Sequence, residues 1–212
     1  MDDHEQGERV REWLRVNGAA ITTGIAVGLA GLLGWQWWQH NQSQHRLDAA
    51  AMFQSLEQAA EDKDTGTFDQ LAGELGAKFK NTPYATMALL RQASEKVGQG
   101  DSDAASKALN EAIQSAQSPA MSALARLRLA RVQLAAGKAQ EALDVIAKIP
   151  AGDFSGLVAE VRGDALLALD RRDEAEAAYQ DALTHLETGA PNRTLVEMKL
   201  ADLGVPASEP GV

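Results

Sequence analysis

The feature that most constrains the fold is a repeated pair of residues in the second half of the chain. Three segments align with one another, and they cover residues 100–113, 137–149 and 171–183. In each, an alanine is followed four residues later by a larger apolar side chain, which places both on one face of a helix. The pairs are Ala105/Leu109, Ala142/Ile146 and Ala175/Tyr179. The alanines are 37 and then 33 positions apart, so we predict an array of similar helical units.

Each aligned segment is preceded by a second helical pattern, at residues 84–97, 123–136 and 156–169. Small residues lie twelve positions before the three alanines, at Ala93, Ala130 and Gly163. Two antiparallel helices that pack about 8–10 Å apart need small side chains where they cross. Gly100, Gly137 and Asp170 are predicted to form the turns between paired helices. The spacing brackets the 34-residue tetratricopeptide (TPR) period, so the hairpins resemble TPR units.

The remaining segments also read as helices and turns, which makes the predicted fold class all-α. Residues 46–62 have an amphipathic pattern with Leu47, Ala51, either Phe53 or Gln54, and Leu56 near one stripe, and a short helix follows the turn at 64–66. Residues 193–203 are predicted to form a C-terminal capping helix, which a solenoid end needs. Aromatic residues make up only 5% of the chain, which favours close-packed small helices over a β-sandwich.

A second constraint comes from residues 16–45, which contain no acidic residue, lysine or arginine before Arg46. The strongly apolar part, residues 18–35, would form a helix of about 27 Å, close to one hydrocarbon core. A cleaved signal would be followed promptly by small residues, but Trp35, Trp37 and Trp38 follow instead. A buried core helix is the other alternative, and its several glycines argue against it. We therefore predict a transmembrane signal anchor.

Flanking charges predict the orientation of this anchor. Arg9, Arg11 and Arg15 precede it, whereas only Arg46 lies close behind it. This bias predicts a cytoplasmic N-terminus and an exported C-terminal domain, which would be periplasmic if the anchor lies in the bacterial inner membrane of a Gram-negative cell. The predicted membrane-interface residues are tryptophans on both sides of the span: Trp13, Trp35, Trp37 and Trp38.

Small residues recur along one side of the span at spacings of four, four and three. Such a stripe lets another helix backbone approach closely in lipid. The predicted helix-packing residues are Ala20, Gly24, Gly28 and Gly31. Glycine is also common in membrane helices, so the alternative is a stripe without a specific contact.

The chain offers little for catalysis. It has no cysteine, and its four histidines lack the spacing that would hold a metal on one helix face. The net charge of −10 argues against nucleic acid as a partner. We predict a protein that is not an enzyme and has no catalytic residues, metal site or cofactor. Arg126, Arg128 and Arg131 are candidates for a groove that binds acidic partner groups, and a solvated ridge is the alternative.

The whole chain resembles the YfgM family of ancillary SecYEG translocon subunits. The resemblance rests on the short N-terminus with acids and arginines, the single apolar span, the central LRLARVQL and RGDALLALDRRDEAEAAYQDAL in the last hairpin. It implies a TPR-like domain beside the translocon. The partners it implies are SecYEG, a membrane-anchored periplasmic chaperone related to prolyl isomerases, and exported client chains.

The expected organisation has five parts. Residues 1–16 form a short cytoplasmic tail, 17–38 the transmembrane anchor and 39–83 a membrane-proximal helix pair; residues 84–204 form TPR-like antiparallel hairpins with a capping helix, and 205–212 a flexible tail. The function predicted is a membrane-tethered periplasmic scaffold that binds proteins beside the Sec translocon and helps handle newly exported proteins. The alternative is a regulatory or cell-envelope assembly scaffold that sequesters or recruits another protein.

Overall fold

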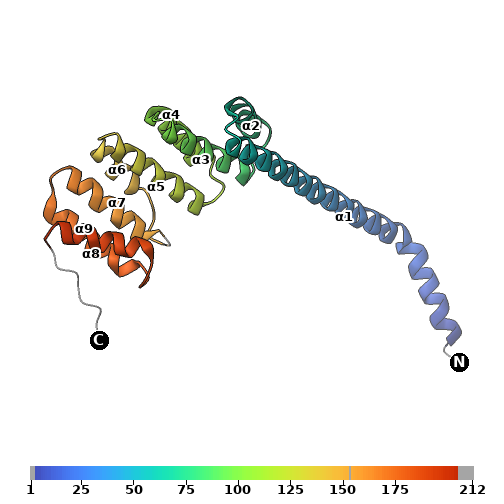
Figure 1. The fold of residues 1–212 in the computed structure, drawn as a ribbon. Coiled ribbons are helices and arrows are strands. Elements are labelled where there is room, and N and C mark those ends of the chain that lie inside the picture. Colours follow the sequence, from blue (N-terminus) through green and yellow to red (C-terminus); the bar gives the residue numbers. More distant parts are fainter. Residues whose placement is uncertain (1–2, 153, 205–212) are drawn as a thin grey trace. The chain divides into compact units, whose positions relative to one another are not determined.

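The computed structural model describes residues 3–152 and 154–204, and within these ranges every regular element is a helix. The prediction of an all-α fold is confirmed there, while the predicted tail 205–212 lies outside the described residues. The helices are α1 (Asp3–Glu61), α2 (Thr65–Lys78), α3 (Pro83–Gly98), α4 (Ser102–Ser115), α5 (Pro119–Ala135), α6 (Ala139–Ile146), α7 (Ser155–Ala168), α8 (Arg172–His185) and α9 (Pro191–Asp202) (Figure 1). The chain divides inside α1 into two compact units, Met1–Asp48 and Ala49–Val212.

The first unit is helical, and none of the side chains described between residues 11 and 48 is buried. No single helix in the described part of the chain meets the length and hydropathy expected of a membrane span. Two segments, Arg11–Ala20 and Thr22–Glu61, meet the criterion together and are bent by 42° relative to each other. The hydroxyls of Thr22 and Thr23 donate to the carbonyls of Gly18 and Ala19, a contact that often accompanies helix bending.

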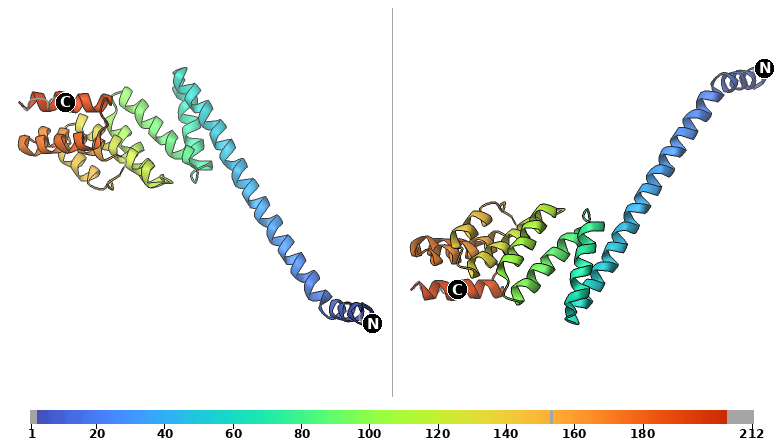
Figure 2. Two further views of the ribbon diagram at one scale, coloured as in Figure 1. Left: turned by 90° about the horizontal axis from the view of Figure 1, so that it is seen from below. Right: turned by 90° about the horizontal axis from the view of Figure 1, so that it is seen from above.

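In the second unit, α3 to α8 form three antiparallel hairpins, each packed against the next (Figure 2). The predicted turn residues have left-handed backbone angles: φ is 78° at Gly100, 74° at Gly137 and 59° at Asp170. One hydrogen bond recurs across each turn, from Asp101 N to Lys96 O, Lys138 N to Gln133 O and Arg171 N to Leu166 O, at 2.8–2.9 Å. The shared bond closes each first helix in the same way. The repeating units that the alanine spacing predicted therefore also share one turn geometry.

The helix crossings are built from the small residues that the sequence singled out. Ala93, Ala130, Ala105, Ala142 and Ala175 are buried, as are the larger Leu109, Ile146 and Tyr179. A Cβ added at Gly163 would lie only 2.4 Å from the Tyr179 ring, so this crossing admits no side chain. The buried apolar clusters link one hairpin to the next. One cluster joins α3, α4 and α5, a second joins α5, α6 and α7, and a third joins α7, α8 and α9.

Two helix boundaries and one buried helix face differ from the sequence-based predictions. Helix α5 begins four residues earlier than expected, because Pro119 occupies its first turn and the Ser118 side chain accepts from Met121 N. Helix α6 ends at Ile146, ahead of Pro150, which disfavours helical backbone at the residue before it. The predicted stripe is only partly observed: Leu56 is buried, whereas Leu47 and Ala51 are exposed. The buried face of α1 in the second unit carries Ala49, Leu56 and Ala59, and it packs against α2 and α3.

Candidate protein-binding groove

The first helices of the hairpins, α3, α5 and α7, lie side by side, because α3 contacts α5 and α5 contacts α7. Two adjoining cavities open along α3 and α5, with volumes of about 310 Å³ and about 220 Å³. Leu90, Ser94 and Arg128 line both, so we treat the cavities as one α3–α5 groove. The larger cavity is also lined by Phe53, Glu57, Met87, Arg91 and Leu124, and the smaller by Ala93, Val97, Leu109, Arg131 and Val132.

Three arginines face this groove, and their charges are compensated to different degrees. Arg91 lies 3.4 Å from the Glu57 carboxylate and 3.0 Å from that of Glu95. Arg131 lies 3.4 Å from the carboxylate of Glu160 on α7. Among the residues that the structure describes, the Arg128 guanidinium makes neither an ion pair nor a hydrogen bond. Of the three groove arginines, Arg128 is therefore the one without a compensating carboxylate in the described part of the chain, and its side chain is exposed.

The three predicted groove arginines are thus not equivalent. Arg128 and Arg131 line the smaller cavity together, whereas Arg126 is partly buried and lines neither cavity. Helical geometry accounts for the difference, since two residues along a helix are about 200° apart around its axis. Arg126 is consequently directed away from the face that carries Arg128.

A polar cluster occupies the same row of helices farther along the solenoid. Glu160 is only 4% exposed, and its carboxylate accepts from Lys199 of α9 at 2.9 Å. Lys199 also lies 2.8 Å from Asp164, which accepts from the Tyr179 hydroxyl at 2.7 Å. Burial, reinforced by the Asp164 contact, raises the pKa of the Tyr179 hydroxyl. These ion pairs attach α9 to α7.

Sequence reasoning missed this cluster. The signal available was an acid inside an otherwise apolar run, Glu160 between Ala159 and Val161. A buried carboxylate requires a partner, but its partner Lys199 lies 39 positions away, and no spacing rule identifies it.

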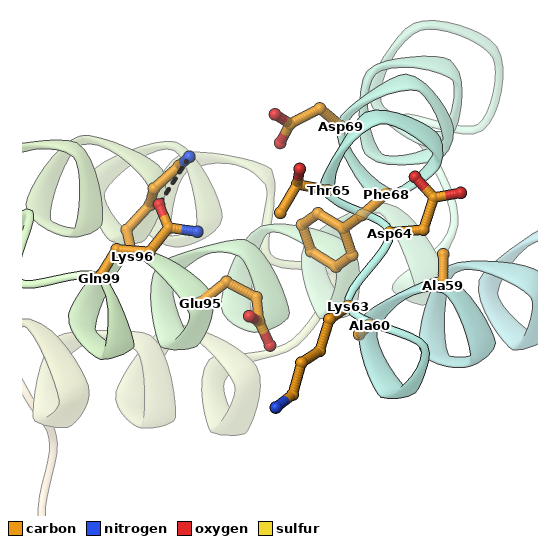
Figure 3. Close-up of a pocket in the computed structure, with 10 residues that line it drawn as sticks. All are labelled: Ala59, Ala60, Lys63, Asp64, Thr65, Phe68, Asp69, Glu95, Lys96 and Gln99. Carbon is orange, nitrogen blue, oxygen red and sulfur yellow. Dashed lines mark hydrogen bonds between the residues drawn. The ribbon is translucent and has the colours of Figure 1, made fainter.

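A third hollow lies where the end of α1 and the start of α2 meet the end of α3 (Figure 3). Its volume is about 20 Å³, which is room for roughly one water. In Figure 3, the Phe68 ring lies between the side chains of Lys63 and Thr65, and Lys96 donates to Gln99 at 3.3 Å. The Thr67 hydroxyl donates to the Asp64 carboxylate and lowers its pKa. These contacts describe a helix cap rather than a ligand site.

The predicted membrane residues all lie on the first unit of the chain. A Cβ added at Gly24, Gly28 or Gly31 would meet nothing within 4 Å, and Ala20 is exposed. The four tryptophans are exposed by 49–70%, and the rings of Trp35 and Trp38 lie 5.3 Å apart. The small-residue stripe is thus open along its length.

Within the described residues, no group of three or more histidine, aspartate or glutamate side chains is placed to hold a metal ion. His185 lies 3.6 Å from Asp181 on an exposed face of α8. The groove is instead lined mainly by apolar side chains, together with Ser94, Glu57 and three arginines, a combination that suits a polypeptide ligand.

Comparison with known proteins agrees with this architecture. The family model described as a tetratricopeptide repeat-like domain matches residues 11–205. A relative from Escherichia coli K12, named ancillary SecYEG translocon subunit, is 26% identical over 204 residues, which cover 96% of this chain and 98% of the relative. Relatives with the same name from Haemophilus influenzae and Aggregatibacter actinomycetemcomitans are 24% and 26% identical, with the same coverage.

The match extends over both units, so it includes the apolar segment as well as the hairpins. It confirms the resemblance to the YfgM family that the sequence indicated. With its repeated turns, its small-residue crossings and a family match over residues 11–205, the chain belongs to the tetratricopeptide repeat-like domain family.

Proposed function

We propose that this chain is a membrane-tethered, TPR-like scaffold that binds protein partners beside the Sec translocon. The observation that carries the proposal is end-to-end similarity to relatives named ancillary SecYEG translocon subunit, since 96% of this chain aligns with 98% of theirs. The geometry supports a binding role, because stacked hairpins offer a long surface and the α3–α5 groove is apolar with an uncompensated arginine.

The apolar segment supplies the tether. Val27, Leu29 and Leu32 are 54–68% exposed within the molecule, and exposed apolar surface on this scale needs a lipid or protein environment. Residues 17–38 form the span in this proposal. The tail 1–16 is cytoplasmic, and the helix pair 39–83 and the hairpins 84–204 are periplasmic. The arginine bias around the span supports this direction.

The partners proposed are SecYEG, exported client chains and a membrane-anchored periplasmic chaperone related to prolyl isomerases. Tethering raises the local concentration of the solenoid at the membrane, which favours weak contacts with emerging chains. The open stripe at Ala20, Gly24, Gly28 and Gly31 gives the span a surface for another membrane helix. The tryptophans at its ends lie at the two interfaces.

Photo-crosslinking in living cells tests the proposal. Crosslinking residues replace Gly28 in the span and Ser94 in the groove, and Asn110 on the exposed face of α4 serves as the control. We expect Gly28 to capture translocon subunits and Ser94 to capture periplasmic chaperones or exported chains. Recovery of envelope-assembly proteins or cytoplasmic regulators alone, from every position, would replace this function with the alternative scaffold role.

Topology has a separate test, made simple because the chain has no cysteine. Single cysteines are introduced at Gln6 and at Asn110. A membrane-impermeant maleimide should label Asn110→Cys in spheroplasts and label Gln6→Cys only after the membrane is broken. The reverse pattern would invert the proposed orientation without affecting the binding role.

A further inference from the structure

Building on the proposed function, we infer that the α3–α5 groove binds a partner segment in which one acidic side chain is flanked on both sides by apolar side chains, with its carboxylate on Arg128.

The charge of the groove carries the first step. Arg91 and Arg131 already face Glu57, Glu95 and Glu160 within 3.4 Å, whereas Arg128 has no such partner among the described residues. A guanidinium offers a planar pair of donors that matches a carboxylate. Arg128 is exposed, so its guanidinium is accessible to a carboxylate of a partner. In a protein of net charge −10, this site therefore favours an anionic group locally.

The position of Arg128 between two cavities decides which carboxylate fits. One cavity extends towards Phe53 and Leu124, and the other towards Val97 and Val132. A C-terminal carboxylate on Arg128 would end the partner chain there and leave one cavity unfilled. An acidic side chain within a segment lets the chain continue in both directions, so apolar neighbours fill both cavities.

The surrounding acids limit the partner to an isolated acidic residue. The carboxylates of Glu57, Glu95 and Glu160 compensate the other two arginines, and a second partner acid would lie near them. Like charges at this range oppose binding. The sequence pattern expected in the partner is apolar–acidic–apolar rather than an acidic run.

The experiment uses the full-length protein in nanodiscs and two capped, fluorescently labelled peptides. Both consist of serine, alanine, leucine and phenylalanine around one central residue, which is glutamate in the first peptide and glutamine in the second. Binding is measured by fluorescence anisotropy for the unaltered protein, for Arg128→Gln and for Arg126→Gln. The Arg126 variant is the matched control, because it removes the same charge from the same helix on another face.

We expect the unaltered protein to bind the glutamate peptide about tenfold more tightly than the glutamine peptide. This ratio is typical of one charge-assisted hydrogen-bonded pair. Arg128→Gln should abolish this preference with little effect on the glutamine peptide, and Arg126→Gln should leave both affinities unchanged. Circular dichroism confirms that each variant is folded.

Three results would overturn the inference: equal affinity for both peptides, equal losses in the two variants, or no binding of either peptide. None of these three results contradicts the proposed translocon role if crosslinks from Gly28 to translocon subunits persist. Loss of those crosslinks together with a preserved glutamate preference would refute the proposed function and leave the groove chemistry intact.

Discussion

Residues 18–38 and residues 84–204, which form the hairpins and α9, are both helical and both rich in alanine, but their apolar side chains have different surroundings. In the hairpins, Ala105, Ala142 and Ala175 are 0% exposed, because neighbouring helices cover them. In the first segment, Leu32 and Leu33 remain about two-thirds exposed at 66% and 65%. Helical sequences of similar composition therefore differ in how far their apolar side chains are buried. The hairpins bury their apolar side chains against neighbouring helices, whereas those of residues 18–38 stay exposed within the described part of the chain.

The glycines make the contrast sharper. At Gly163 an added Cβ meets the Tyr179 ring, while at Gly28 it meets nothing. One glycine is required by a contact within the protein. The other has room for a larger side chain within this molecule.

The largest expected effect comes from placing a charge on the first segment. Leu29→Arg should lower membrane insertion by about 3 kcal/mol, because arginine is costly at the centre of a bilayer. Leu195→Arg on α9 is the matched control, since the two leucines are 54% and 44% exposed. Membrane fractionation measures both. Similar retention of both variants in the membrane would contradict the lipid environment of residues 18–38.

The next effect is expected at the last helix crossing. Gly163→Ala should lower the free energy of unfolding of the hairpins by about 2 kcal/mol, because the new methyl overlaps the buried Tyr179 ring. The same change at Gly73, where a Cβ meets nothing within 4 Å, should raise stability by up to about 1 kcal/mol. Chemical denaturation followed by circular dichroism compares the two. A stabilising Gly163→Ala would show that the crossing is not close-packed.

An ion pair inside the solenoid gives a test with an expected effect of similar size. Lys199→Met leaves the buried Glu160 with only the longer Arg131 contact, and we expect a loss of about 2 kcal/mol. Lys78→Met removes an equally short 2.8 Å pair with Glu74, but both groups are near the surface, so almost no change is expected. Equal losses in denaturation experiments would mean that burial does not distinguish these pairs.

The smallest effect concerns acid stability. The Thr67 hydroxyl holds the pKa of Asp64 below its ordinary value. This carboxylate therefore stabilises the fold above the pKa of the unfolded chain, and the contribution is lost as pH falls through the folded pKa, below about pH 4. Asp64→Asn keeps a capping side chain but removes the titration, so thermal unfolding should depend less steeply on pH in that range. An unchanged slope would exclude Asp64 as a contributor.

The parts of this fold that were predictable depend on local spacing. Alanine pairs four residues apart and the turn positions Gly100, Gly137 and Asp170 led to the hairpins, because helix periodicity and left-handed turns depend on neighbours in sequence. The ends of α5 and α6 were less well predicted. Pro119 and Pro150 act at single residues, and their effect on helix bounds depends on whether the proline begins a helix or follows one.

The candidate groove was only partly predictable. The run from Arg126 to Arg131 indicated a basic face, but the sequence did not show that Glu160 would approach Arg131 and leave Arg128 uncompensated. That distinction depends on α5 and α7 lying side by side, across 29 residues of sequence. Sequence periodicity does not show which carboxylate will approach which arginine when the two lie on helices far apart in the sequence.

The measurement that tests the central contrast most directly uses the tryptophans. All four lie between residues 13 and 38, so the tryptophan emission of the full-length protein reports on that part of the chain alone. In vesicles that contain brominated lipids, bromines near the headgroups should quench this emission more strongly than bromines at the bilayer centre, as expected for side chains at the two interfaces. Emission that neither lipid quenches would show that residues 18–38 lie outside the bilayer and would contradict the account.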